Sequence, residues 1–351
     1  MTGDVTDAAG DAGATDFGDV VDRRTLGKIA AGFVVAVALV YLLGVAVGWE
    51  QTLSRLRNAE LRWLGAACLS TLACLAAWGK AWQIVLRVGG IDVPYRKLVV
   101  TYFAATFANY VTPLGQAGGE PFIAYVLSRD TEASYEQSLA SVVTADLLNL
   151  LPFFNFAAVG LGYLLLRSQL AEAAEDLALG LGALAVGIPA LVVGGWQYRT
   201  AVERGVLGIV APVARRTDRF SVESARDRIE RFYESIETIA ASPRALASAT
   251  GFAYLGWVFF ALPLYFAGLT LNLPIPLLLV FFVVPASTLA GMVPTPGGLA
   301  AVEGALVGLV VALTALTAAD ALAVAAVYRL ASYWFALGVG GLAALWVVAR
   351  A

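Results

Sequence analysis

Long apolar segments separated by short polar ones run through most of this 351-residue sequence. Six of them reach the roughly 20 residues that a transmembrane helix needs to cross a bilayer. The pattern therefore predicts an all-α, polytopic membrane protein with six full spans, at residues 27–48, 61–87, 137–166, 177–197, 245–268 and 321–349.

Two other apolar segments, 98–128 and 277–318, are each interrupted by the pattern T-P-x-G-x-A-x-x-E, at residues 112–120 and 295–303. Proline and glycine interrupt helices, and they leave pieces of about 10–16 residues here. At about 1.5 Å per residue, such pieces fall short of the ~30 Å hydrocarbon core. We therefore expect each segment to form a re-entrant hairpin. If the hairpins cross the membrane instead, the protein has eight spans.

Positively charged loop residues predict the topology, because Lys and Arg gather on the cytoplasmic side of membrane proteins. Bases stand at the start of the first span and at the end of the second, and nine Arg lie between residues 198 and 244. A cytoplasmic N-terminus places most of these inside, provided that the first hairpin opens inward and the second outward. Arg55 and Arg57, in the loop 49–60, are the exception. We expect a multi-pass protein of the cell membrane with its N-terminus in the cytoplasm.

The spans and hairpins divide one transmembrane domain, 23–349, into two halves, 27–166 and 177–349. Each half has three spans and one hairpin. Because three crossings are an odd number, the second half is inverted relative to the first, as in many secondary transporters. The sequence thus predicts an inverted repeat.

Two polar segments lie outside the predicted spans. Residues 1–22 carry six Asp and no base, which predicts a disordered acidic tail rather than a signal peptide. The insert 198–244 is expected to form an amphipathic helix on the cytoplasmic surface, either as a packed connector or to bind anionic headgroups through its arginines. Its apolar positions at helical spacing are Val222, Ala225, Ile229, Phe232, Ile236 and Ile239.

Composition excludes several classes of protein. With 60% hydrophobic and 14% charged residues, this is not a soluble globular chain. The sequence has no histidine, which removes histidine acid–base catalysis and histidine metal ligation. It also has no phosphate-binding loop, metal-ligand cluster or nucleophile motif. We expect a protein that is not an enzyme, with no catalytic residues, no cofactor, no metal and no nucleic-acid partner.

Five ionisable side chains are predicted at membrane depth, where a charge at the helix centre costs roughly 2.5–3.5 kcal/mol. They are Lys80, Glu120, Asp146, Glu303 and Arg329. Asp146 lies 26 residues after Glu120, and Arg329 lies 26 after Glu303, so charges recur at matching places in the two halves. Either these residues form internal ion pairs, such as Glu303 with Arg329 and Asp146 with Lys80, or they face a cavity that holds a polar ligand group.

The helix breaks favour the second interpretation for the two glutamates. Half-helix ends expose unpaired N–H and C=O groups, which can bind a polar group of a ligand. Glycines at the break allow close approach of another backbone or of a ligand. Besides the five charges, the expected substrate-binding set therefore contains Thr112, Gly115, Gly118, Gly119, Thr295, Gly297 and Gly298.

The second break also carries a resemblance to a known family. The run Val293-Pro294-Thr295-Pro296-Gly297-Gly298-Leu299-Ala300-Ala301-Val302-Glu303-Gly304, followed by Tyr328-Arg329-Leu330 and Tyr333-Trp334, is its core. With these motifs, residues 25–349 resemble the flippase-like integral membrane family named for the transmembrane region of bacterial lysylphosphatidylglycerol synthases.

The resemblance implies a lipid-handling membrane domain. In the synthases this region moves the modified phospholipid between leaflets, and similar regions are fused to archaeal glycosyltransferases that act on polyprenyl lipids. The aminoacyl-transfer domain of the synthases has no counterpart in this sequence, so their synthetic activity is not implied. Members commonly carry E-R-x-x-D where this chain has Ala145-Asp146-Leu147-Leu148-Asn149. The charge at 146 is therefore reversed, so the resemblance does not imply recognition of the family's usual headgroup.

From these observations we expect a translocase that moves a polar-headed lipid between leaflets, with a membrane phospholipid or a polyprenyl-linked lipid as its substrate. The alternative is a non-catalytic membrane subunit that presents lipid to a partner, such as a glycosyltransferase or another lipid-modifying enzyme.

Overall fold

The computed structural model describes most of the predicted transmembrane domain, and every regular element in that part is helical. The described residues are 49–111, 116–166, 194–214, 222–293 and 295–348, with single positions between 34 and 45 and between 187 and 191. The acidic tail 1–22 and most of the spans predicted at 27–48 and 177–197 lie outside them.

Four of the predicted spans are confirmed as long apolar helices. They are α4 (Leu61–Val88), α7 (Tyr135–Leu166), α11 (Pro243–Thr270) and a final run in which α14 (Ala318–Arg329) continues through a π-helical turn, Leu330–Trp334, into α15 (Phe335–Val348). Each contains a stretch long and apolar enough to cross a membrane. The chain is an all-α, polytopic membrane protein, as its hydrophobic pattern predicts.

Both expected hairpins consist of paired shorter helices. The first is α5 (Tyr95–Val111) with α6 (Gln116–Asp130), and the second is α12 (Leu277–Leu289) with α13 (Ala301–Leu313). Pro296–Leu313 has the length of a span only if the non-helical residues before α13 are counted. The 13 residues of α13 alone cover about 20 Å, too little for a bilayer core.

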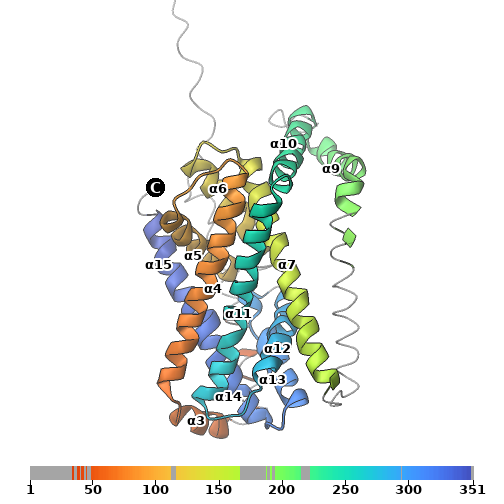
Figure 1. The fold of residues 1–351 in the computed structure, drawn as a ribbon. Coiled ribbons are helices and arrows are strands. Elements are labelled where there is room, and N and C mark those ends of the chain that lie inside the picture. Colours follow the sequence, from red (N-terminus) through yellow and green to blue (C-terminus); the bar gives the residue numbers. More distant parts are fainter. Residues whose placement is uncertain are drawn as a thin grey trace, which may run out of the picture.

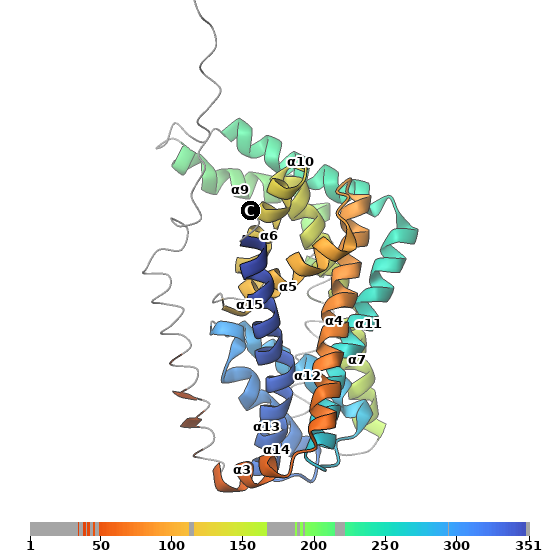
Figure 2. The same cartoon turned by 90° about the vertical axis from the view of Figure 1, so that its left-hand side faces the viewer.

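The two hairpins lie towards opposite ends of the helix bundle. In both views α5 and α6 lie near the end that carries α10 (Val222–Ala240), whereas α12 and α13 lie near the end that carries α3 (Trp49–Arg57) (Figures 1 and 2). This arrangement agrees with hairpins that open to opposite sides. The inverted repeat itself stays a prediction.

Contacts between the two predicted halves are reciprocal. Helix α4 packs along α11, the first hairpin helix α5 packs on α15, and the second hairpin helix α12 packs on α7. A glycine allows close approach at each contact: a Cβ added to Gly256 would lie 2.3 Å from the Trp78 ring, one at Gly160 2.3 Å from Phe282, and one at Gly340 2.6 Å from the Phe103 carbonyl oxygen. In each predicted half, the first helix of the hairpin thus packs on the last span of the other half.

The polar insert forms two helices, α9 (Arg199–Ala214) and α10, which lie across one end of the bundle (Figure 1). Helix α10 is amphipathic, with Ile239 buried and Glu230 and Glu234 exposed, and its cytoplasmic location stays a prediction. At the opposite end, Arg55 of α3 pairs with Asp320 of α14 at 2.8 Å. That contact gives a structural role to one of the two arginines that do not fit the predicted topology.

Candidate functional site

The second helix break has a backbone that few sequences can adopt. Gly297, Gly298 and Ala300 have φ angles of 57°, 64° and 71°, in the left-handed region. A Cβ added to Gly297 would lie 2.0 Å from Cε2 of Tyr333, and one at Gly298 would lie 2.6 Å from the Gly291 Cα. Both glycines are therefore required by close contacts as well as by φ. The Thr295 hydroxyl donates a hydrogen bond of 3.0 Å to the Leu299 carbonyl oxygen and holds the break together.

Glu303 and Arg329 meet at this break as a buried ion pair. Arg329 Nε lies 2.6 Å from Glu303 Oε1, and the two side chains are only 10% and 6% exposed. The other carboxylate oxygen accepts the Ala300 N–H at 2.6 Å, a position that stabilises the start of α13. A buried charge is tolerated when it is paired and its remaining atoms are hydrogen-bonded. Glu303 meets both conditions.

Arg329 also binds the break itself. Its Nη2 donates a hydrogen bond of 3.0 Å to the Gly297 carbonyl oxygen, which the break leaves without a helical partner. Its guanidinium carbon lies 4.3 Å from the ring centroid of Tyr333, four residues further on the same face. One arginine therefore holds the unwound backbone, the carboxylate and an aromatic ring.

Tyr333 connects this cluster to the first hairpin. Its hydroxyl donates to the Tyr110 carbonyl oxygen at 3.4 Å, and the two rings lie 4.9 Å apart. Tyr110 is in the last turn of α5, directly before the first helix break. Tyr333 is in a π-helical turn, an element that often marks functional sites. The two breaks thus approach each other through this pair of tyrosines.

The first break has a second polar cluster, formed by two carboxyl groups. The Glu120 side chain of α6 lies beside that of Asp146 on α7. Asp146 Oδ1 also accepts the indole N–H of Trp82 at 3.1 Å, and the Trp82 ring stacks edge-on against Tyr102 at 4.8 Å. Two carboxylates this close repel each other, and the Trp82 indole N–H offers one donor against that repulsion.

Lys80 does not join that cluster. Its ammonium group donates to Gln83 Oε1 at 2.6 Å and lies 5.1 Å from the ring centroid of Tyr95. The structure therefore forms one of the two ion pairs considered from the sequence, Glu303 with Arg329, but not that of Asp146 with Lys80.

Among the other expected residues, Thr295, Gly297 and Gly298 shape the second break, and Gly118 and Gly119 lie in α6. Thr112 and Gly115 lie outside the described residues. Sequence reasoning did not assign Trp82, Tyr110 or Tyr333 to the site. Only Tyr333 had a usable signal, its spacing of four residues from Arg329.

Comparison with known proteins agrees with this architecture. The family model described as the lysylphosphatidylglycerol synthase TM region matches residues 29–340. A "UPF0104 membrane protein" of Methanothermobacter thermautotrophicus is 26% identical over 89% of the chain and 92% of that protein, and one of Pyrococcus horikoshii is 25% identical over 89% and 95%.

A longer relative has a more specific name. The "Glycosyltransferase AglD" of Haloferax volcanii is 28% identical over 87% of this chain but only 52% of its own length. The matched region of the family model includes both helix breaks and all five membrane-depth charges. The chain is a multi-pass membrane protein and belongs to the family of the lysylphosphatidylglycerol synthase TM region.

Proposed function

We propose that this protein is a flippase-like lipid translocase that moves a polar-headed lipid, a phospholipid or a polyprenyl-linked lipid, between leaflets. The observation that carries the proposal is the meeting of two broken helix pairs through Tyr110 and Tyr333, with the partly buried Glu120 and Asp146 at one break and the buried Glu303 at the other. Non-helical backbone and charge at membrane depth are tolerated only where protein or a water-filled cavity satisfies them, and in transporters such places bind the substrate.

The reciprocal contacts support a movement of one half against the other. Helices α5 and α12 each pack on the last span of the other half, so a small rotation would change both contacts together. The lipid headgroup would enter between the halves near Glu120, Asp146, Glu303 and Arg329, while its chains stay in the bilayer.

The two clusters suit different roles. Glu303 and Arg329 neutralise each other and hold the second break. Within the described residues, no ion pair engages Glu120 or Asp146, and we assign ion coupling to these two carboxyl groups. The sequence has no ATP-binding motif, which favours transport that is downhill or ion-coupled.

The remaining parts of the proposal concern topology and chemistry. We place the protein in the cell membrane with its N-terminus in the cytoplasm, from the loop charges. We assign it no enzymatic activity, no cofactor and no nucleic-acid partner, with membrane lipid as substrate.

The longer relative favours one alternative. A glycosyltransferase in which this region makes up about half of the length suggests a non-catalytic membrane subunit that presents lipid to a lipid-modifying enzyme. In that case the purified chain would move no lipid alone and would co-purify with such a partner.

Transport by the purified chain tests the proposal. The full chain is reconstituted into liposomes with fluorescent lipids of different headgroups, and the fraction that reaches the protected leaflet is followed with a membrane-impermeant quencher. Faster exchange than in protein-free liposomes, for at least one headgroup, is expected. Exchange at the protein-free rate for phospholipids and polyprenyl lipids alike, together with a co-purifying glycosyltransferase, would favour the alternative.

A further inference from the structure

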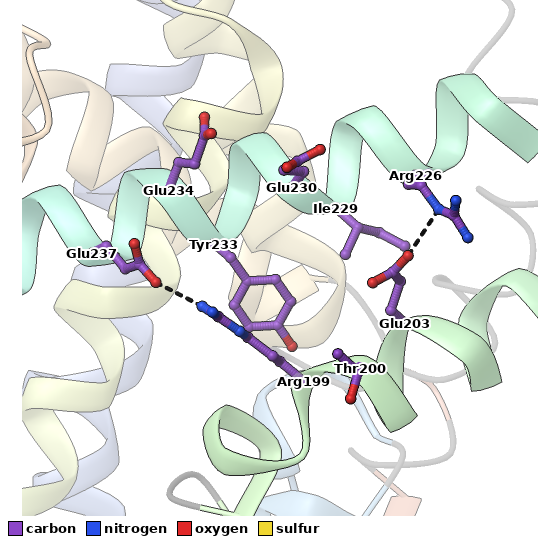
Figure 3. Close-up of a pocket in the computed structure, with 9 residues that line it drawn as sticks. All are labelled: Arg199, Thr200, Glu203, Arg226, Ile229, Glu230, Tyr233, Glu234 and Glu237. Carbon is purple, nitrogen blue, oxygen red and sulfur yellow. Dashed lines mark hydrogen bonds and ion pairs between the residues drawn. The ribbon is translucent and has the colours of Figure 1, made fainter.

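Helices α9 and α10 form a layer joined by two ion pairs. Arg199 Nη1 lies 2.7 Å from Glu237 Oε1, and Arg226 Nε lies 3.0 Å from Glu203 Oε1, on either side of the Tyr233 ring (Figure 3). Each pair is exposed and contributes little alone. Together with the ring between them, they hold the two helices at a fixed spacing.

A cavity of about 310 Å³ lies between this layer and the first turns of α7. Its walls are mostly apolar and include Leu139 of α7, Val202 and Val206 of α9, and Ile229 and Phe232 of α10. The volume lies within the ~300–1,000 Å³ typical of small-molecule sites. Apolar walls provide no hydrogen-bond donors, so they do not favour binding of a free inorganic anion in this cavity.

The cavity also has a basic edge. Glu136, Glu203 and Arg228 line it, and the charge of Glu203 is balanced by its ion pair with Arg226. Arg228 Nε and Arg231 Nη2 lie 3.5 and 3.9 Å from Glu136 Oε1. These distances exceed the ~2.7–2.9 Å of a charge-assisted hydrogen bond, so neither guanidinium is tightly engaged. The two arginine side chains are 56% and 51% exposed and share one carboxylate, which leaves a net positive charge.

The cavity lies at the end of a membrane-spanning helix, where a membrane surface is expected. Tyr135, which also lines it, is the first residue of an apolar helix long enough to cross a bilayer. Tyrosine is common at such boundaries. An apolar cavity with a basic edge at this depth matches a lipid whose chain lies beside its phosphate.

We propose that the cavity between α7, α9 and α10 binds one anionic phospholipid, with an acyl chain against Val202, Val206 and Phe232 and the phosphate at Arg228 and Arg231. This site lies apart from the helix breaks and goes beyond the proposed translocation, because it can be occupied whether or not the protein moves lipid. An acidic peptide fits less well, since Glu230 and Glu234 line the neighbouring cavity on α10.

Native mass spectrometry of the full chain tests this site. The protein in detergent is titrated with phosphatidylglycerol or with phosphatidylcholine of the same acyl chains, and the lipid-bound fraction is measured. The wild-type protein should retain phosphatidylglycerol more strongly. Arg228→Gln with Arg231→Gln should weaken this retention roughly 30-fold, because each arginine near an anionic lipid contributes about fivefold.

Matched variants separate the headgroup contact from the chain contact. Arg87→Gln with Arg96→Gln removes the same charge from exposed positions elsewhere and should leave retention unchanged. Val206→Trp fills the cavity without changing charge and should weaken retention of phosphatidylglycerol. Glycerol 3-phosphate or an acidic peptide should not displace the lipid. Equal retention of the two lipids, equal loss in both double variants, or displacement by either competitor would overturn the proposal.

Discussion

Substituting Arg329 with Gln should destabilise the protein more than any exposed charge substitution. The change removes a 2.6 Å ion pair to Glu303, a 3.0 Å hydrogen bond to the Gly297 carbonyl oxygen and a guanidinium 4.3 Å from the Tyr333 ring. It leaves the Glu303 carboxylate, 6% exposed, without its cation.

The magnitude follows from burial. Removing one member of a buried ion pair costs about 3–5 kcal/mol, because the remaining charge stays desolvated. The lost hydrogen bond adds about 1 kcal/mol. We therefore expect the free energy of unfolding of Arg329→Gln to fall by roughly 4–6 kcal/mol.

Reversible unfolding in mixed micelles measures this loss, with two matched variants beside it. Arg55→Gln removes an arginine that is 49% exposed from its pair with Asp320 and should cost at most about 1 kcal/mol. Glu303→Gln combined with Arg329→Gln removes both charges and should cost clearly less than the sum of the two single variants.

Two results would contradict this expectation. Arg329→Gln could be as mild as Arg55→Gln, or the double variant could lose the full sum of the two single losses. Either result would mean that Glu303 and Arg329 do not interact as a desolvated pair.

Two further stability predictions use the same assay. Gly297→Ala should cost about 2–4 kcal/mol, because the residue has a φ of 57° and the added Cβ would lie 2.0 Å from a tyrosine ring. Gly304→Ala, whose added Cβ would have nothing within 4 Å, should be neutral or stabilising. Equal losses of stability in the two variants would contradict the geometry of the break. Trp82→Phe should cost about 1–3 kcal/mol, because it removes the indole N–H that donates to Asp146. In the matched control Trp78→Phe, the indole N–H that is removed makes no hydrogen bond among the described residues. Equal losses of stability would show that the hydrogen bond between Trp82 and Asp146 does not contribute.

The fold was largely predictable because a bilayer imposes simple rules on a sequence. The spans 61–87, 137–166, 245–268 and 321–349 follow from length and hydrophobicity, and the structure confirms them within a few residues. The hairpins follow from proline and glycine, which interrupt helices. The contacts between α5 and α15 and between α7 and α12 could not be foreseen, because they depend on which distant glycines allow close approach.

The site was predictable only in part. The 26-residue spacing identified Glu303 and Arg329 together, and they meet. The alternative pairing of Lys80 with Asp146 failed for a geometric reason. Residues two apart on a helix point to nearly opposite sides, so Trp82 faces Asp146 while Lys80 faces away towards Gln83.

The contact between Tyr110 of the first hairpin and Tyr333 of the last span had no signal in the sequence. Tyr110 and Tyr333 resemble ordinary interfacial or core aromatics until the structure brings their rings to 4.9 Å. Aromatic residues are frequent at membrane depth and at its surfaces, so their type alone does not mark a site.

We propose that the carboxyl groups at the two breaks handle the headgroup, and lipid exchange by a charge-neutralised variant is the sharpest test of this. Wild-type protein, Glu120→Gln with Glu303→Gln, and the exposed control Glu230→Gln with Glu234→Gln are reconstituted at equal folded amounts, and initial rates of leaflet exchange are compared. We expect a rate near the protein-free level for the first double variant and an unchanged rate for the control. A wild-type rate for Glu120→Gln with Glu303→Gln would contradict it.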